Sequence, residues 1–206
     1  MTVTPYFQQD GVTLYHGDCR EILAQLRRFD LLLTDPPYGI DWATNYSRFS
    51  KGVNDKTPIA NDKRGDIDLE PFIAATDEQI IFGANCLPQP RAGSYLIWDK
   101  RCDDGFAFLS DGEAAWWSEG RGVYICSVNA QRHRSKAGLH PTQKPVQLMT
   151  WCIKKAKKSQ TILDPFAGSG TTLLAARLEG RQAVGIEISE RYCEIAANRL
   201  RQRLLF

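Results

Sequence analysis

The chain has 206 residues, a length that predicts a single domain with one well-buried core. Its 26 Lys and Arg residues nearly balance 24 Asp and Glu residues, so a formal net charge of +2 indicates no particular charged partner. The six cysteines show neither a Cys-x-x-Cys pair nor a histidine at ligand spacing, so we expect no structural metal. No apolar run approaches the length of about 18 residues that a membrane span needs, and the N-terminus lacks a signal pattern. We therefore expect no membrane span and a cytoplasmic location.

The first predicted unit is a strand at 12–16, a tight turn at Gly17 and Asp18, and a helix. After the turn, apolar residues fall on one helical face: Ile22, Leu23 and Leu26. Asp18 fits the N-cap of this helix, which leads into another strand at Phe29. A strand, a helix and a strand within about 25 residues predict a parallel crossover connection. In a parallel sheet, ligands bind at the carboxyl ends of the strands. We therefore expect Asp18 and Asp35 at the same edge of a sheet.

The second strand, at 29–33, ends in a rigid acidic turn. Its apolar run is too short for an ordinary helix and is typical of a strand buried on both faces of a parallel sheet. Pro36 and Pro37 donate no backbone N–H and keep Asp35 extended, so the carbonyl of Pro36 is left to accept a bond. Together with the ring of Tyr38, these groups suit a flat ligand that carries N–H donors. The alternative is a plain turn that ends the strand.

The segment 40–68 has little periodicity, and a segment of this length is usually a functional loop or disordered. Aromatic and basic side chains alternate within it: Trp42, Tyr46, Arg48, Phe49 and Lys51. They suit stacking on bases and contacts with phosphates, although a simple surface loop fits equally well. The elements expected next are a helix at 69–76 and strands at 79–82, 94–98, 114–118 and 122–128. We expect the last two strands to pair through a turn at 119–120, with Trp116 and Trp117 in packing roles.

Positive charge is concentrated between residues 131 and 158. This segment has no acidic residue and eight basic ones: Arg132, Arg134, Lys136, Lys144, Lys154, Lys155, Lys157 and Lys158. Such an asymmetry is typical of a local footprint for a polyanion, whereas 154–158 fits a solvated helix face equally well. Within the segment, prolines rigidify the hexapeptide at 140–145, and a helix follows.

A glycine-containing motif runs from Asp164 to Thr172, after a predicted strand at 161–163. It predicts a glycine-rich turn and a helix N-terminus, where exposed N–H groups favour a negative ligand group. Leu173 stands where the dinucleotide fingerprint needs its third glycine, and no Gly-Lys-Ser/Thr follows, which argues against NAD and ATP. Glu187, 17 residues past Gly170, ends the next strand at about the spacing of an acid that binds ribose. It also fits an acid that caps the closing helix from Ser189.

Three motifs together resemble the S-adenosylmethionine-dependent DNA amino-methyltransferases, in the subgroup whose catalytic motif precedes the cofactor motif. They are Asp-Pro-Pro-Tyr at 35–38, His-Pro-Thr-Gln-Lys-Pro at 140–145, and Asp-Pro-Phe-Ala-Gly-Ser-Gly-Thr-Thr at 164–172. Small phage-type or stand-alone adenine-N6 enzymes, including those of restriction-modification systems, are the most similar. The resemblance implies an α/β Rossmann-like class I fold: a circularly permuted, mostly parallel seven-stranded sheet with one antiparallel strand.

The resemblance also implies roles for individual residues. The cofactor pocket is expected to contain Asp164, Phe166, Ala167, Gly168 and Gly170, with Thr171 and Thr172 near the amino-acid end of the cofactor. Glu187 is expected to accept the ribose hydroxyls, Asp18 to bind the adenine amino group of the cofactor, and Lys144 to close over the methionine end. The residues expected to contact DNA are Arg132, Arg134, Lys136, Arg48 and Lys51.

For catalysis, Asp35 and the Pro36 carbonyl are expected to accept the two amino hydrogens of the target base. The nitrogen lone pair then points at the sulfonium methyl for direct transfer. Pro37 keeps the turn rigid, and Tyr38 stacks on a base flipped out of double-stranded DNA.

The target-recognition insertion is expected to be minimal, at about 99–140 of a single 1–206 domain. Recognition is then limited to a few base pairs or shared with the flexible loop at about 40–68 or with the second subunit of a homodimer. Alternatives remain: a cytosine-N4 enzyme, which more often carries Ser at position 35; an RNA or protein-glutamine methyltransferase, which usually carries Asn there; and an inactive nucleic-acid-binding module.

Overall fold

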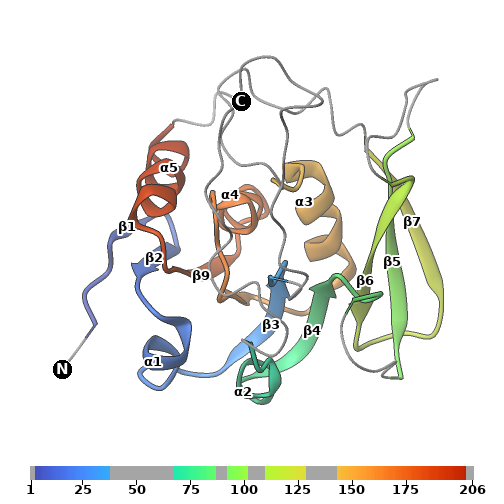
Figure 1. Ribbon diagram of the computed structural model, residues 1–206, viewed down its shortest axis with the longest axis horizontal. Coiled ribbons are helices and arrows are strands. Elements are labelled where there is room, and N and C mark those ends of the chain that lie inside the picture. Colours follow the sequence, from blue (N-terminus) through green and yellow to red (C-terminus); the bar gives the residue numbers. More distant parts are fainter. Residues whose placement is uncertain (1–2, 38–66, 87–91, 102–109, 129–142, 203–206) are drawn as a thin grey trace.

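The computed structural model describes residues 3–37, 67–86, 92–101, 110–128 and 143–202 (Figure 1). In these ranges, nine strands form one sheet in the order β1-β2-β9-β8-β3-β4-β6-β5-β7. The strands are β1 (Phe7–Gln9), β2 (Val12–His16), β3 (Phe29–Thr34), β4 (Thr76–Phe82), β5 (Ser94–Asp99), β6 (Gly112–Trp117), β7 (Val123–Ser127), β8 (Thr161–Asp164) and β9 (Gln182–Glu187). The helices are α1 (Cys19–Leu23), α2 (Glu70–Ala74), α3 (Val146–Lys155), α4 (Thr171–Leu178) and α5 (Glu190–Arg201).

The sheet is mostly parallel, and this confirms the predicted fold class. Strands β2, β9, β8, β3 and β4 run parallel as successive neighbours, and β7 is parallel to β5. β6 is antiparallel to both of its neighbours, β4 and β5. The two strands nearest the C-terminus, β8 and β9, therefore lie between β2 and β3, as the permuted order requires.

The described sheet has more strands than the seven expected, and two of them rather than one are antiparallel. The additional antiparallel strand, β1, forms a hairpin with β2 through Asp10 and Gly11. Both residues have positive φ, 50° and 78°, which suits the two-residue turns that match the twist of a hairpin. Asp-Gly between two short strands is a recognised hairpin signal. The sequence therefore contained a signal for β1, although this strand was not predicted.

The expected pairing of strands 114–118 and 122–128 is wrong. β6 and β7 do not pair, because β5 lies between them. Trp116 and Trp117 bury their rings on opposite faces of β6, and this side-chain arrangement suits an interior strand. The connection then passes the start of β5, where the backbone N–H of Gly122 donates to the Ser94 hydroxyl at 3.1 Å.

Helices cover both faces of the sheet (Figure 1). On one face, apolar residues of β3, β4, β5 and β6 pack with those of α3, α4 and α5. On the other face, Ile22 of α1 and Phe72 of α2 pack against Leu32 and Ile81. Leu31, Leu32, Leu33 and Thr34 are all 0% exposed, so the prediction that this strand is buried on both faces is confirmed. Within the described ranges, no helix has the length and apolarity needed to cross a membrane.

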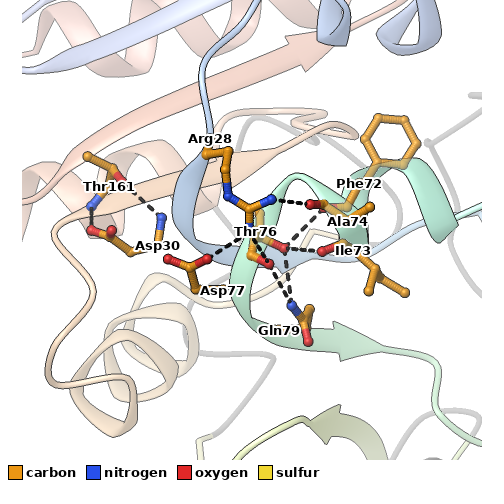
Figure 2. Close-up of polar contacts among 9 residues, drawn as sticks. All are labelled: Arg28, Asp30, Phe72, Ile73, Ala74, Thr76, Asp77, Gln79 and Thr161. Atoms are coloured by element: carbon orange, nitrogen blue, oxygen red, sulfur yellow. Dashed lines mark hydrogen bonds and ion pairs between the residues drawn. The ribbon is translucent and has the colours of Figure 1, made fainter.

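Polar contacts anchor the start of β3 to both neighbouring strands (Figure 2). The Asp30 carboxylate accepts from the backbone N–H groups of Gln160 at 2.7 Å and Thr161 at 2.8 Å, and the Asp30 N–H donates to the Thr161 hydroxyl at 2.9 Å. On the other side, the guanidinium of Arg28 donates to the Ala74 carbonyl at 2.6 Å and to Asp77 at 2.8 Å. These contacts hold the strand that leads to Asp35.

We expect Asp30→Ala to lower the free energy of unfolding by about 1 to 2 kcal/mol at pH 7, because two backbone N–H groups lose a charged acceptor. Burial tends to raise the pKa of Asp30, but the bonds from Thr161 and Gln160 outweigh it and lower the pKa. The stabilisation is therefore present above the ordinary aspartate pKa of about 3.9 and is lost as pH falls below it. Urea denaturation at pH 7 and pH 3 measures this difference, which should shrink at pH 3. Asp77→Ala, which removes an exposed ion pair, is the control and should change stability by less than about 1 kcal/mol.

Candidate active site

The carboxyl ends of four parallel strands place acidic side chains along one edge of the sheet. Asp35 follows β3, Asp164 ends β8, Glu187 ends β9, and Asp18 lies just after β2. The strand register sets their order along the edge, since Leu32 pairs with Leu163, and His16 with Glu187. The structure therefore brings Asp35 of the acidic turn to the same edge as Asp164 and Glu187, which lie more than 120 residues later in the sequence.

Asp35 contacts a buried lysine that lies far from it in sequence. The Lys144 side chain is only 6% exposed, and its ammonium forms ion pairs with Asp35 and, at 3.0 Å, with Glu113 of β6. Glu113 also pairs with Lys100 at 2.5 Å, and the Lys144 ammonium lies 5.2 Å from the centre of the Phe82 ring. Burial alone would lower the pKa of Lys144, but the two carboxylates outweigh burial and raise it. Lys144 therefore carries its charge at any ordinary pH.

Glu113 and Lys100 were not predicted as site residues. Lys100 follows the end of β5, so its position resembles that of Asp35 after β3. Glu113 is near the beginning of β6, and an antiparallel strand begins at the edge where its parallel neighbours end. The position of Lys100 at this edge could therefore have been predicted from the sequence. The position of Glu113 could not, because it depends on β6 being antiparallel to its neighbours.

Asp164 is a buried carboxyl group next to the acidic turn. It is 3% exposed and accepts from the hydroxyl of Thr34 at 2.8 Å and from the backbone N–H of Phe166 at 3.2 Å. Burial raises its pKa to about 6, although hydrogen bonds from Thr172, Thr34 and Phe166 act in the opposite direction. A ligand that brings a cation or N–H donors to this carboxyl group would favour its charged form.

The glycine-rich loop bends around the Glu187 carboxylate. Gly168 and Gly170 have φ of 50° and 77°, and the Gly168 N–H donates to Glu187 at 2.8 Å. The Ser189 N–H donates to the other oxygen at 2.8 Å, so Glu187 does cap the start of α5, as one interpretation held. Each carboxylate oxygen has a second lone pair, so capping does not exclude the binding of hydroxyl groups. Burial, the largest influence, raises the pKa of Glu187.

Arg199 of α5 holds the other side of this loop. Its guanidinium donates to the Ser169 carbonyl at 2.5 Å, the Ser169 hydroxyl at 2.9 Å and the Thr171 hydroxyl at 3.2 Å. This contact could not be predicted from the sequence, because nothing in the spacing connects Arg199 to a loop about thirty residues earlier. The loop is thus held from both β9 and α5.

Asp18 caps α1, as its position predicts. Its carboxylate accepts from the Arg20 N–H at 2.9 Å and from the Arg20 guanidinium at distances down to 2.5 Å. The hydrogen bond from the Arg20 side chain is the largest of the influences that lower the pKa of Asp18. Asp18 is thus an ionised acceptor at the far end of the acidic row.

Several predicted site residues lie outside the described ranges, including the expected DNA contacts and part of the hexapeptide. These are Tyr38, Arg48, Lys51, Arg132, Arg134, Lys136, His140, Pro141 and Thr142. The end of the basic segment, at 154–158, is described and lies away from Asp35, because ten-residue α3 carries the chain about 15 Å from the site. There Lys154 pairs with Glu179 at 3.3 Å, and Lys155 lies 3.9 Å from the centre of the Tyr124 ring.

The edge therefore combines acceptors with a shaped loop. Buried carboxyl groups at Asp164 and Glu187, and an ionised one at Asp18, can accept from a ligand rich in N–H and O–H donors. The partly exposed ring of Phe166 lies beside them and offers an apolar surface. Among the described residues, no cluster of three metal-ligating side chains occurs. This combination suits the binding of a ligand that is rich in hydrogen-bond donors.

Comparisons with known proteins identify relatives of this chain. The family described as DNA methylase (N6_N4_Mtase) matches residues 98–198. The type II methyltransferase M2.MboI of Moraxella bovis is 42% identical over 250 aligned positions, which cover 97% of this chain and 92% of the relative.

Two solved structures share the fold. The M1.HpyAVI–SAM complex aligns with a TM-score of 0.59 at 21% identity, over 91% of this chain and 99% of the other. The PvuII DNA methyltransferase (cytosine-N4-specific) aligns with a TM-score of 0.66 at 14% identity, over 100% of this chain and 91% of the other.

We expect Asp164→Asn to raise the free energy of unfolding by about 2 kcal/mol at pH 8. The raised pKa means that the folded protein keeps a proton on Asp164 between about pH 4 and pH 6, where the unfolded chain has lost it. The wild type therefore loses stability as pH rises through this window, and the amide variant does not. Denaturation at pH 4.5 and pH 8 should show a smaller gain at the lower pH. Asp18→Asn is the matched control and should be destabilising at pH 8, because its carboxylate has a lowered pKa and caps α1.

Proposed function

The chain belongs to the N6/N4 DNA methylase family, and we propose that it is a site-specific methyltransferase acting on the N6 amino group of adenine in double-stranded DNA. S-adenosyl-L-methionine is the methyl donor and supplies an electrophilic methyl group on a sulfonium. One observation carries the proposal: Asp35 directly follows a strand buried on both faces, and the last residue of that strand, Thr34, donates a hydrogen bond to Asp164 at the start of the glycine-rich loop. An acceptor for an amino group and a cofactor pocket thus share one sheet edge.

The described residues fit the proposed cofactor. S-adenosyl-L-methionine offers ammonium, hydroxyl and amino donors, and the acidic row provides acceptors for all three. In our proposal Asp164 receives the ammonium group, Glu187 the ribose hydroxyls and Asp18 the adenine amino group. The loop from Phe166 to Thr172, through Ala167, Gly168, Gly170 and Thr171, shapes the pocket. The segment around Lys144 closes over the methionine end, while the Lys144 ammonium itself pairs with Asp35.

At the acceptor side, Asp35 and the carbonyl of Pro36 are proposed to bind the two hydrogens of the target amino group. An exocyclic amino nitrogen is a poor nucleophile, because its lone pair is delocalised into the ring. Two acceptors held by a rigid Pro36-Pro37 turn favour a pyramidal nitrogen and stabilise the charge that develops on it. Tyr38 is proposed to stack on the flipped base.

Cytosine N4 is the second candidate target, because the same acceptors suit either amino group. The aspartate at position 35 favours adenine, whereas the resemblance associates serine at this position with cytosine enzymes. For DNA contacts we propose Arg48, Lys51, Arg132, Arg134 and Lys136, which would supply salt-dependent affinity for phosphates. Because the proposed recognition insertion at about 99–140 is short, we also propose that the second subunit of a homodimer contributes to recognition of the DNA sequence.

Identification of the modified nucleoside tests the proposed function. The protein is incubated with unmethylated duplex DNA and labelled S-adenosyl-L-methionine, and the digested DNA is resolved by chromatography. We expect label in N6-methyl-2′-deoxyadenosine. Label in N4-methylcytosine, or in RNA alone, contradicts the adenine assignment. Cofactor binding without transfer to any DNA indicates an inactive binding module.

A second prediction separates the acceptor from the cofactor pocket. Asp35→Ala should lower kcat by at least about 10³-fold, because the transition state loses an acceptor, while cofactor affinity stays near that of the wild type. Glu187→Gln is the contrasting variant and should weaken cofactor binding by about tenfold. Calorimetric titration and single-turnover rates at saturating cofactor measure the two effects. Weakened cofactor binding in Asp35→Ala, with full activity at saturation, would show that Asp35 belongs to the cofactor pocket instead.

A further inference from the structure

Four charged side chains form a continuous row beside the acidic turn. Asp35 follows β3, Lys144 precedes α3, Glu113 lies in β6 and Lys100 follows β5. The row alternates in sign: Lys144 pairs with both carboxylates, and Glu113 pairs with both ammonium groups. Its formal charge is therefore zero, although its members come from four separate parts of the chain.

Lys144 is the member of this row most dependent on its partners. Its side chain is 6% exposed, and its surroundings are Asp35 from β3, Glu113 from β6 and the ring of Phe82 from β4. Lys100 shares the Glu113 carboxylate with Lys144, so it competes for this partner. A buried ammonium that loses one of two carboxylate partners is left poorly compensated, so it tends to move or to lose its proton.

We propose that Glu113 is a positioning residue of the transfer site. Held by Lys100, it keeps the Lys144 ammonium against Asp35, and the ammonium holds that carboxylate in the orientation in which it accepts the target amino group. The inference rests on the proposed function, because it assigns a purpose to Glu113 only if Asp35 is the acceptor. Glu113 itself does not touch the target base or the cofactor in this scheme.

The contacts of Glu113 connect it to Asp35 through Lys144. One of its oxygens lies 2.5 Å from Lys100 and the other 3.0 Å from Lys144, so both oxygens engage members of the row. Asp35 comes directly after four residues, 31–34, that are 0% exposed, so its backbone has little freedom to adjust. The orientation of its carboxylate therefore depends on side-chain partners such as Lys144.

The first arm of the test needs no enzymatic activity. The pKa of Lys144 is measured by NMR in protein labelled with ¹³C- and ¹⁵N-lysine, and the signal is assigned by its loss in Lys144→Met. In Glu113→Gln the pKa of Lys144 should fall by at least about one unit, since one of two stabilising carboxylates is gone. The matched control is Glu179→Gln, which removes the partner of Lys154 away from Asp35 and should leave the Lys144 signal unchanged. An unchanged pKa in Glu113→Gln overturns the inference, whether or not the protein methylates DNA.

The second arm measures transfer as a function of pH. Glu113→Gln should lower kcat by about 10- to 100-fold near pH 7.5, with unchanged cofactor affinity. As pH rises through the lowered pKa of Lys144, the ammonium is lost and kcat should fall further, whereas the wild type shows no such decline. Lys144→Met should be slow at every pH, without this decline, because it has no ammonium to lose.

The outcomes distinguish the two proposals. A wild-type protein that transfers no methyl group to DNA contradicts the proposed function, while the NMR arm still reports on the contact between Glu113 and Lys144. A shifted Lys144 pKa together with wild-type kcat in Glu113→Gln contradicts the positioning role alone. Thermal unfolding of each variant confirms that the comparison is made between folded proteins.

Discussion

The burial of β3 on both faces determines where the candidate chemistry lies. Leu31, Leu32 and Leu33 are fully enclosed between the two helical layers, and β4 and β8 bond the strand on either side. A shift in the register of this strand would draw Asp30 or Asp35 into the apolar interior, which is costly for a charged group. Asp35, the first residue after it, is therefore placed within narrow limits relative to Asp164 on β8. The proposed transfer site uses this rigidity, because direct transfer depends on the alignment of two bound groups.

The opposing environments of the acidic residues divide the edge into two parts. At Asp35, a buried lysine provides positive charge and compensates the carboxylate within the protein. At Asp164 and Glu187, burial dominates and raises the pKa, so these groups are better suited to a ligand that brings its own donors. The same edge thus contains a self-compensated acceptor beside carboxyl groups that gain from a bound cofactor. This division agrees with the roles that we propose for them.

Much of the fold and part of the candidate site could be predicted from sequence because the signals are local. The apolar run before Asp35, the cap at Asp18 and the glycines before α4 each depend on neighbouring residues. The arrangement of β5, β6 and β7 could not be predicted in this way, because it depends on which faces Trp116 and Trp117 bury. The contact of Lys144 with Asp35 spans 109 residues, and the place of Glu113 depends on the direction of its strand. Such contacts exist only once the whole sheet is assembled.

The permuted strand order also has a consequence for how the chain folds during synthesis. β2 and β3 are made long before β8 and β9, the two strands that lie between them in the sheet. Asp30, for example, contacts a residue 131 positions later. Until then, β2 and β3 lack these neighbours and expose unpaired backbone groups and apolar side chains. The sheet can therefore close only after β8 and β9 have been synthesised, and this non-local topology favours slow folding and a need for protection from aggregation.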